Sequence, residues 1–159
     1  MFSKSLTKEQ ALQKLRHYCS YQERCHSEVK EKLYALGVAK EHDEIISILI
    51  KENWLNEERF GIAYAIGKFR IKQWGRIKIK YELKQKRIND HFINIALQQI
   101  NKKKYTDVLG KLAKEKYADL KTEQYLIRKK KTINYLLQKG YEMELVNTVV
   151  SSFGNRKTV

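Results

Sequence analysis

Four side chains that could bind a metal ion lie close together near the N-terminus: His17, Cys19, Cys25 and His26. Imidazole and thiolate are the groups with which proteins bind zinc. Zinc sites pair their ligands about two to four residues apart on turns. Here five residues separate the two cysteines, and no second close pair follows. We therefore predict no metal site, and we expect both cysteines to be reduced, small side chains in partly buried positions.

Two short polar runs, His42-Asp43-Glu44 and Asn89-Asp90-His91, could supply acid–base chemistry. Both stand directly before apolar residues at helical spacing, so we interpret them as helix-start residues. The sequence contains no glycine-rich phosphate loop, no Gly-x-Gly-x-x-Gly, no nucleophile elbow and no His-Glu-x-x-His. The prediction is a protein that is not an enzyme and uses no cofactor.

Basic side chains are concentrated in the C-terminal part of the chain. The formal net charge is +15 over 159 residues. Residues 1–66 hold ten Lys and Arg against ten Asp and Glu, whereas residues 67–159 hold twenty-three against eight. This asymmetry favours a nucleic acid, an anionic protein or a membrane surface as partner. A lysine-rich solvated surface with no specific partner is the alternative.

Residues 68–87 contain nine basic side chains and one acid, Glu82. Phosphates attract such a cluster without regard to base sequence, because released counterions supply much of the binding free energy. Phe69, Trp74 and Tyr81 could stack on unpaired bases, but we expect each to pack in the core. A second cluster follows at residues 128–131. The candidate binding residues are Lys68, Arg70, Lys72, Arg76, Lys78, Lys80, Lys84, Lys86, Arg87, Arg128, Lys129, Lys130 and Lys131.

The elements that position these cations are predicted to be helices. The chain has no proline and seven glycines, so little interrupts helical structure. Thr7 and Asn56 have the form of N-caps, and Gly37 and Gly140 follow apolar helical patterns as stops. The predicted helices cover residues 7–20, 27–36, 41–53, 57–72, 76–86, 90–101, 105–117, 122–139 and 142–152.

The basic segment itself is predicted to be a helical hairpin. One apolar face of the helix at 57–72 is defined by Phe60, Ala63, Tyr64, Gly67 and Ile71. Gly75 is expected to take the positive φ that turns the chain. Residues 77–83 alternate between apolar and polar, which is typical of a strand. No second strand-like run could pair with them, so we predict a helix there as well.

Three blocks of the sequence can be superposed on one another. The superposition aligns Leu33 with Leu83 and Leu136. It also aligns Gly37 with Arg87 and Gly140. We predict an all-α protein of three tandem three-helix repeats, at 7–53, 56–101 and 104–153, followed by a tail at 154–159. Such repeats bury their cores by stacking, which predicts an elongated, curved array.

Two motifs make the chain similar to a known family. The first runs from Leu55 to Phe60 and closes with Gly75, Ile79, Leu83, Lys86 and Ile88, and the second consists of Ala11, Leu15, Tyr18, Arg24, Glu28, Leu33 and Gly37. Together they resemble the repeats of the RecX family of bacterial regulatory proteins. The chain departs from the family pattern at Gly61, where alanine is usual, at His26-Ser27 after Cys25, and at Arg87, where glycine is usual.

The resemblance implies a regulator of the RecA recombinase that is not an enzyme. Members of the family bind along the groove of the RecA–single-stranded DNA filament and restrain ATP hydrolysis, strand exchange and filament extension. This places the expected role in homologous recombination, DNA repair and the SOS response. The expected partners are the RecA filament and its single-stranded DNA. The alternative is a stand-alone helical nucleic-acid-binding protein that acts through its basic face.

The sequence also bears on location. No apolar run approaches the roughly 18 residues that a membrane span needs, and the N-terminus lacks the apolar stretch of a secretory signal. We expect a cytoplasmic monomer with no membrane partner.

Overall fold

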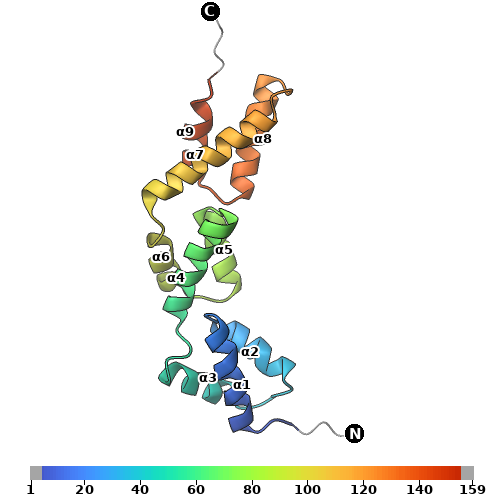
Figure 1. Ribbon diagram of the computed structural model, residues 1–159, viewed down its shortest axis with the longest axis vertical. Helices are drawn as coiled ribbons and strands as arrows, with labels where there is room; N and C mark the ends of the chain where they lie inside the picture. Colours follow the sequence, from blue (N-terminus) through green and yellow to red (C-terminus); the bar gives the residue numbers. More distant parts are fainter. Residues whose placement is uncertain (1–4, 155–159) are drawn as a thin grey trace, which may run out of the picture. The chain divides into compact units, whose positions relative to one another are not determined.

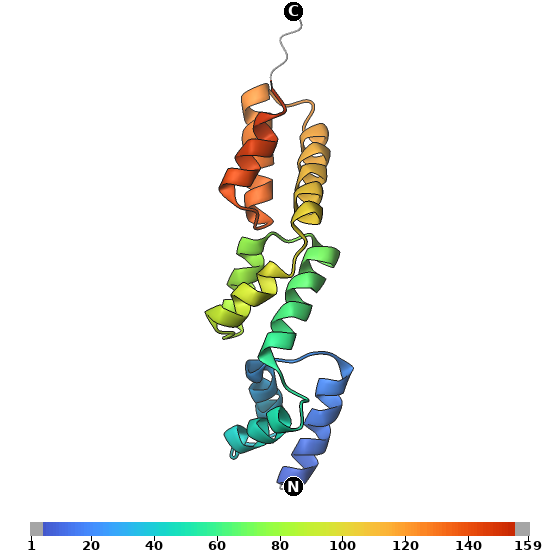
Figure 2. The same ribbon diagram turned by 90° about the vertical axis from the view of Figure 1, so that its left-hand side faces the viewer.

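The computed structural model describes residues 5–154, and these residues form helices with no strand among them (Figures 1 and 2). The predicted all-α class is therefore confirmed, including a helix where residues 77–83 alternate. The helices are α1 (Lys8–Tyr21), α2 (His26–Ala35), α3 (His42–Lys51), α4 (Glu57–Gly67), α5 (Arg76–Gln85), α6 (Asp90–Gln98), α7 (Lys102–Asp119), α8 (Tyr125–Gln138) and α9 (Met143–Ser151), with a π-helical turn, η1 (Lys68–Lys72), after α4.

Local hydrogen bonds explain where several helices begin. The Thr7 hydroxyl accepts from the main-chain N–H of Gln10, and the Gln10 side chain accepts from the N–H of Thr7, which completes a capping box. The side chains of Asn56, Asn89 and Asn101 accept the N–H three residues ahead at 2.9–3.0 Å. His42 begins α3 and Asn89 caps α6, so both polar runs are helix starts, as predicted.

The three-fold repeat is visible in the backbone at the end of the second helix of each repeat. Gly37, Arg87 and Gly140, which the sequence aligns, all have positive φ, at 77°, 63° and 97°. The N–H that follows each of them bonds back to the carbonyl of the aligned leucine, at 2.9, 3.1 and 3.2 Å. Helices α2, α5 and α8 therefore end in the same turn, although one of the three uses an arginine.

The described chain divides into two compact units. The N-terminal unit contains residues 5–64 and 83–96, and the C-terminal unit contains residues 65–82 and 97–154. Helices α1, α2 and α3 pack on one another in the N-terminal unit, as α7, α8 and α9 do in the C-terminal unit (Figures 1 and 2). The division cuts through α4, α5 and α6, so the proposed repeat boundaries near residues 53–56 and 101–104 stay a prediction.

Two expectations about the hairpin are wrong. The positive φ at its turn belongs to Gln73, at 57°, and not to Gly75. The apolar face of α4 is also different, because Ala63 and Ile71 are exposed whereas Ala65 and Phe69 are buried. The wide turn η1 changes the angular spacing of side chains after Gly67, so a regular 3.6-residue period fails there.

Leu83 provides a test of the core. Its side chain is fully buried, as are Leu33 and Leu136 in the other repeats. Leu83→Ala is expected to lower the free energy of unfolding by about 2–5 kcal/mol, because the lost methyl groups leave a cavity. Urea unfolding followed by circular dichroism measures this change. A loss near zero would mean that the inward face of α5 is misassigned.

Candidate basic surface

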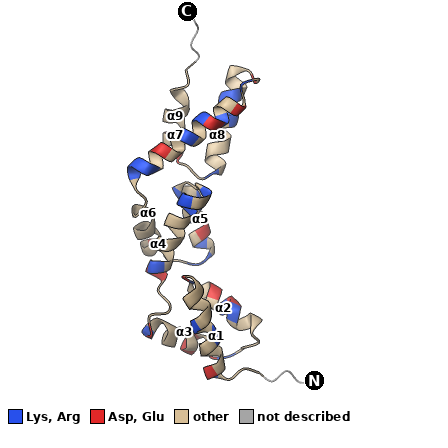
Figure 3. Cartoon of the chain, in the orientation of Figure 1, with Lys and Arg blue, Asp and Glu red and all other residues tan. Residues whose placement is uncertain are grey.

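The candidate cations differ in what surrounds them. Figure 3 shows Lys and Arg along α5, α7 and α8. Arg70, Lys72 and Lys80 are exposed in the C-terminal unit and have no acidic partner among the described residues. Arg87 in the N-terminal unit and Lys129 and Lys130 on α8 also lack one. These six side chains can meet an external anion without breaking an ion pair.

Trp74 brings two of the lysines together. The Lys68 ammonium lies 5.1 Å from the centre of a Trp74 ring, and the Lys78 ammonium lies 4.6 Å from it. An indole ring attracts cations at its faces, so Trp74 holds both lysines beside the turn between η1 and α5. Trp74 is itself half-buried, which places the two ammonium groups near the surface.

Arg76 has a structural role and is not a free cation. Its guanidinium forms a 2.7 Å ion pair with Glu142 and lies 3.8 Å from the centre of the Tyr105 ring. The Tyr105 hydroxyl accepts from the main-chain N–H of Arg76 at 3.0 Å and donates to the Glu142 carboxylate. The three side chains thus form a closed network in which the guanidinium and the main-chain N–H of Arg76 both have partners.

Main-chain hydrogen bonds join the start of α5 to the end of α8. The N–H groups of Gly75 and Ile77 donate to the carbonyls of Lys139 and Gly140 at 2.8 and 2.9 Å. The first amides and last carbonyls of a helix have no partner within it. Here amides at the start of α5 bond to carbonyls at the end of α8, so both sets of groups have partners. A Cβ on Gly75 would lie 2.2 Å from the Gly140 oxygen, so the glycine is required for close approach.

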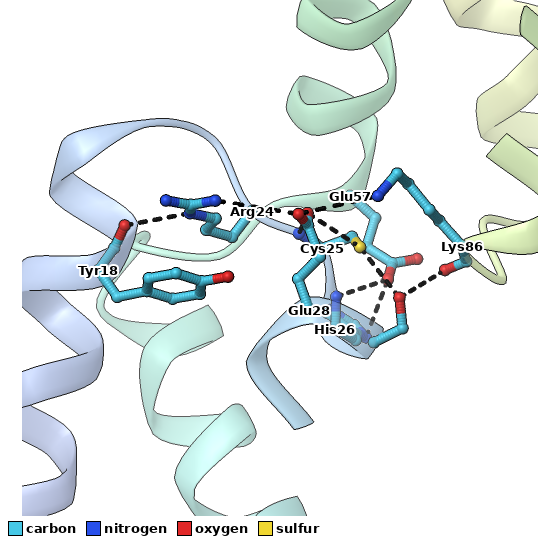
Figure 4. A network of polar contacts seen from close by, with 8 residues as sticks. Tyr18, Arg24, Cys25, His26, Glu28, Glu57 and Lys86 are labelled. Atoms are coloured by element: carbon cyan, nitrogen blue, oxygen red, sulfur yellow. Dashed lines mark hydrogen bonds and ion pairs between the residues drawn. The ribbon is translucent and has the colours of Figure 1, made fainter. Parts of the chain in front are cut away.

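The N-terminal unit contains the equivalent junction, built from side chains (Figure 4). The main-chain N–H of His26 donates to Glu57 at 3.2 Å, as that of Arg76 does to Tyr105. The Ser27 hydroxyl donates to the Lys86 carbonyl at 3.0 Å. The start of α2 is therefore joined to the end of α5 through the Ser27 side chain, whereas main-chain groups join the start of α5 to the end of α8.

The other candidates have partners of their own. Lys86 lies 3.8 Å from Glu28, Lys84 lies 3.6 Å from Asp90, and Lys131 lies 2.5 Å from Glu123. The Arg128 guanidinium lies 3.6 Å from the centre of the Tyr117 ring and donates to the Tyr117 carbonyl at 2.6 Å. Arg128 therefore joins α8 to α7.

The three aromatic residues of the basic segment have different environments. Phe69 is buried, and the centre of its ring lies 5.7 Å from the centre of the Tyr105 ring. The prediction that Phe69 packs in the core is therefore confirmed. Trp74 is half-buried under the two lysines. Tyr81 is 60% exposed, so the prediction of core packing is wrong for this residue.

The two cysteines are free and buried. Burial raises the pKa of the Cys19 thiol to about 11 and raises that of Cys25, so both favour the protonated, unreactive form. Among the described residues, no group of three His, Cys, Asp or Glu side chains has the arrangement of a metal site. No described helix is long and apolar enough to span a membrane.

Tyr105→Phe tests the network around Arg76. It removes the acceptor for the Arg76 N–H and a hydrogen bond to Glu142, so we expect a loss of about 1–3 kcal/mol in the free energy of unfolding. Burial, and then the hydrogen bond to Glu142, raise the pKa of Tyr105. The folded state therefore keeps a proton that the unfolded state loses above about pH 10, and stability should fall as the pH rises beyond that value. Urea titrations near neutral pH and above about pH 10 should show a smaller alkaline loss in Tyr105→Phe.

Two segments of the chain match family models. Residues 56–97 match the second three-helix domain of RecX, and residues 104–150 match the third. The chain belongs to the RecX family. The predicted recognition is confirmed. Asn56 and Asn101 cap the first helices of the two matched segments.

Curated relatives and solved structures of RecX support the assignment of the chain to this family. The chain is 32% identical to regulatory protein RecX of Clostridium perfringens over 82% of its length and 62% of the relative. It is 35% identical to that of Clostridium tetani over 78% of its length and 58% of the relative. The crystal structure of RecX from Lactobacillus salivarius has a TM-score of 0.81 at 25% identity and covers 91% of this chain and 95% of that one. The chain thus spans about three-fifths of the length of these two Clostridium relatives.

Sequence reasoning missed the residues that build the junction in the C-terminal unit. Tyr105, Tyr141 and Glu142 were not singled out, yet Tyr105 and Tyr141 are fully buried and the Tyr141 hydroxyl donates to the Gln73 carbonyl at 2.8 Å. A glycine near the end of each of two predicted helices, at 75 and 140, was the available signal. Their mutual contact is a tertiary feature that spacing along the chain does not reveal.

Proposed function

We propose that this chain binds the RecA–single-stranded DNA filament and inhibits RecA, restraining ATP hydrolysis, strand exchange and filament extension. The observation that supports this most is the exposure of Arg70, Lys72 and Lys80 without acidic partners in a member of the RecX family. A RecA–single-stranded DNA filament presents repeated negative charge from its phosphates. Cations without an acidic partner can bind these phosphates without first breaking an ion pair.

The contact surface in this proposal is a subset of the candidate cations. Arg70, Lys72 and Lys80 interact with the polyanion, and Arg87, Lys129 and Lys130 are additional contacts. Arg76 and Arg128 instead hold the helices that carry these side chains. Binding would depend strongly on salt, because each phosphate contact releases condensed counterions. The action is by binding alone, with no covalent chemistry and no cofactor.

The decisive experiment titrates the protein into RecA that hydrolyses ATP on single-stranded DNA. Excess single-stranded DNA is added in a parallel series to bind any protein that recognises DNA alone. Inhibition that persists with excess DNA, at fewer protein copies than RecA subunits, is the result we expect. Relief of the inhibition by excess DNA would instead support the second candidate, a stand-alone nucleic-acid-binding protein whose basic face binds phosphate.

A further inference from the structure

Tyr81 is an aromatic side chain on α5 that the fold does not use. Ile79 and Leu83 are fully buried, and Tyr81 lies two residues from each, which is about 200° around a helix. The ring therefore projects from the side of α5 opposite the core, where it is 60% exposed. It has no hydrogen bond and no ring contact among the described residues.

The surroundings of Tyr81 are apolar and cationic. Ile77, one helical turn earlier, is 52% exposed. Lys80 is exposed and has no acidic partner among the described residues. Around the helix axis, Lys78 and Lys80 lie on opposite sides of Tyr81, and the Lys78 ammonium lies against Trp74. An aromatic ring with flanking cations can stack on a base while the cations contact the adjacent phosphates.

We infer that Tyr81 is a stacking platform for an unpaired base of single-stranded nucleic acid, with Lys80 and Lys78 at the neighbouring phosphates. The inference rests on the proposed function, and it assigns one side chain to contact with bases. Lysine is depleted at protein–protein interfaces, so the chemistry of this face favours a nucleic acid over an acidic protein. Phe69 and Trp74 are less suited to this role. Phe69 is buried, and the ammonium groups of Lys68 and Lys78 lie against the Trp74 ring.

The test compares two oligonucleotides of equal length, one of thymidines and one of abasic sites, by fluorescence anisotropy with the full chain. Tyr81→Leu is expected to weaken binding to the thymidine strand by about 5- to 100-fold, as lost stacking on one base predicts. Binding to the abasic strand should hardly change. Tyr81→Phe should bind like the wild type, because stacking needs the ring and not the hydroxyl.

Tyr21→Leu is the matched control. Tyr21 is 81% exposed at the end of α1, in the part of the chain with balanced charge, so its loss should affect neither strand. Unchanged thymidine binding by Tyr81→Leu, or an equal loss on both strands, would overturn the inference. So would a variant that binds free DNA normally but binds RecA-coated DNA weakly, since the ring would then contact protein. If the wild type itself fails to inhibit RecA, the proposed function fails, whatever Tyr81 does.

Discussion

Replacing Arg70, Lys72 and Lys80 together by glutamate is expected to abolish inhibition of RecA and to weaken binding to single-stranded DNA by about 100-fold at low salt. All three side chains are exposed and lack an acidic partner in the described structure. Their reversal therefore removes contacts to phosphate without breaking an ion pair. The slope of log affinity against log salt should become shallower by about 2 to 3, because each lost phosphate contact removes about one counterion.

The choice of these three residues follows from the structure. Arg76 is excluded because its reversal would place a second carboxylate beside Glu142 and disturb folding. The matched control reverses Lys14, Lys40 and Lys51, which are also exposed and unpaired but lie where charge is balanced. Both triple variants change the net charge equally, so a general charge effect would weaken them alike. Equal loss in the two variants, with helical circular dichroism intact, would contradict a localised basic surface.

Gly75→Ala is expected to lower the free energy of unfolding by about 3 kcal/mol, the largest effect of any single methyl group that we predict for this chain. The new Cβ would lie 2.2 Å from the Gly140 oxygen and 2.4 Å from the Tyr141 nitrogen. Both neighbours are main-chain atoms, so no side-chain rotation can relieve the contact. The start of α5 must move away from the end of α8, and the hydrogen bonds of Gly75 and Ile77 to Lys139 and Gly140 are lost or lengthened.

Gly110→Ala is the control for this substitution. Gly110 lies inside α7, and a Cβ there would have no neighbour within 4 Å. Alanine is the better helix former, so this variant should be more stable by about 0.5–1 kcal/mol. Urea unfolding of the two variants should shift in opposite directions. A Gly75→Ala protein as stable as the wild type would show that the junction between α5 and α8 is not closely packed.

The local signals of the sequence were sufficient for the helices and their order. Capping residues such as Thr7 and Asn56 act within one turn, so their effect can be read from neighbouring positions. Gly37 and Gly140 were predicted as helix stops, and Arg87, which aligns with them, has a positive φ as they do. The predicted apolar face of α4 failed at Ala63, which is exposed, and again after Gly67, where the turn η1 places Ile71 at the surface.

The candidate site was predicted as a list of charges, and the structure divided that list by environment. Arg76 and Lys80 are equivalent in a charge count, yet one is paired with Glu142 and the other has no acidic partner in the described chain. Tyr81 and Phe69 are both aromatic residues in the same segment, but only Phe69 is buried. These differences arise from side chains far away in sequence, which composition and spacing do not place.

By itself, the sequence determined the helical class, the repeated helix ends and the excess of positive charge, because each depends on residue type and local spacing. Only the tertiary structure decided that Gly75 serves close approach, that Arg76 is structural and that Tyr81 faces solvent. The physical reason is that hydrogen bonding, ion pairing and burial depend on which segments meet, and the contact of residue 75 with residue 140 forms only when the chain folds.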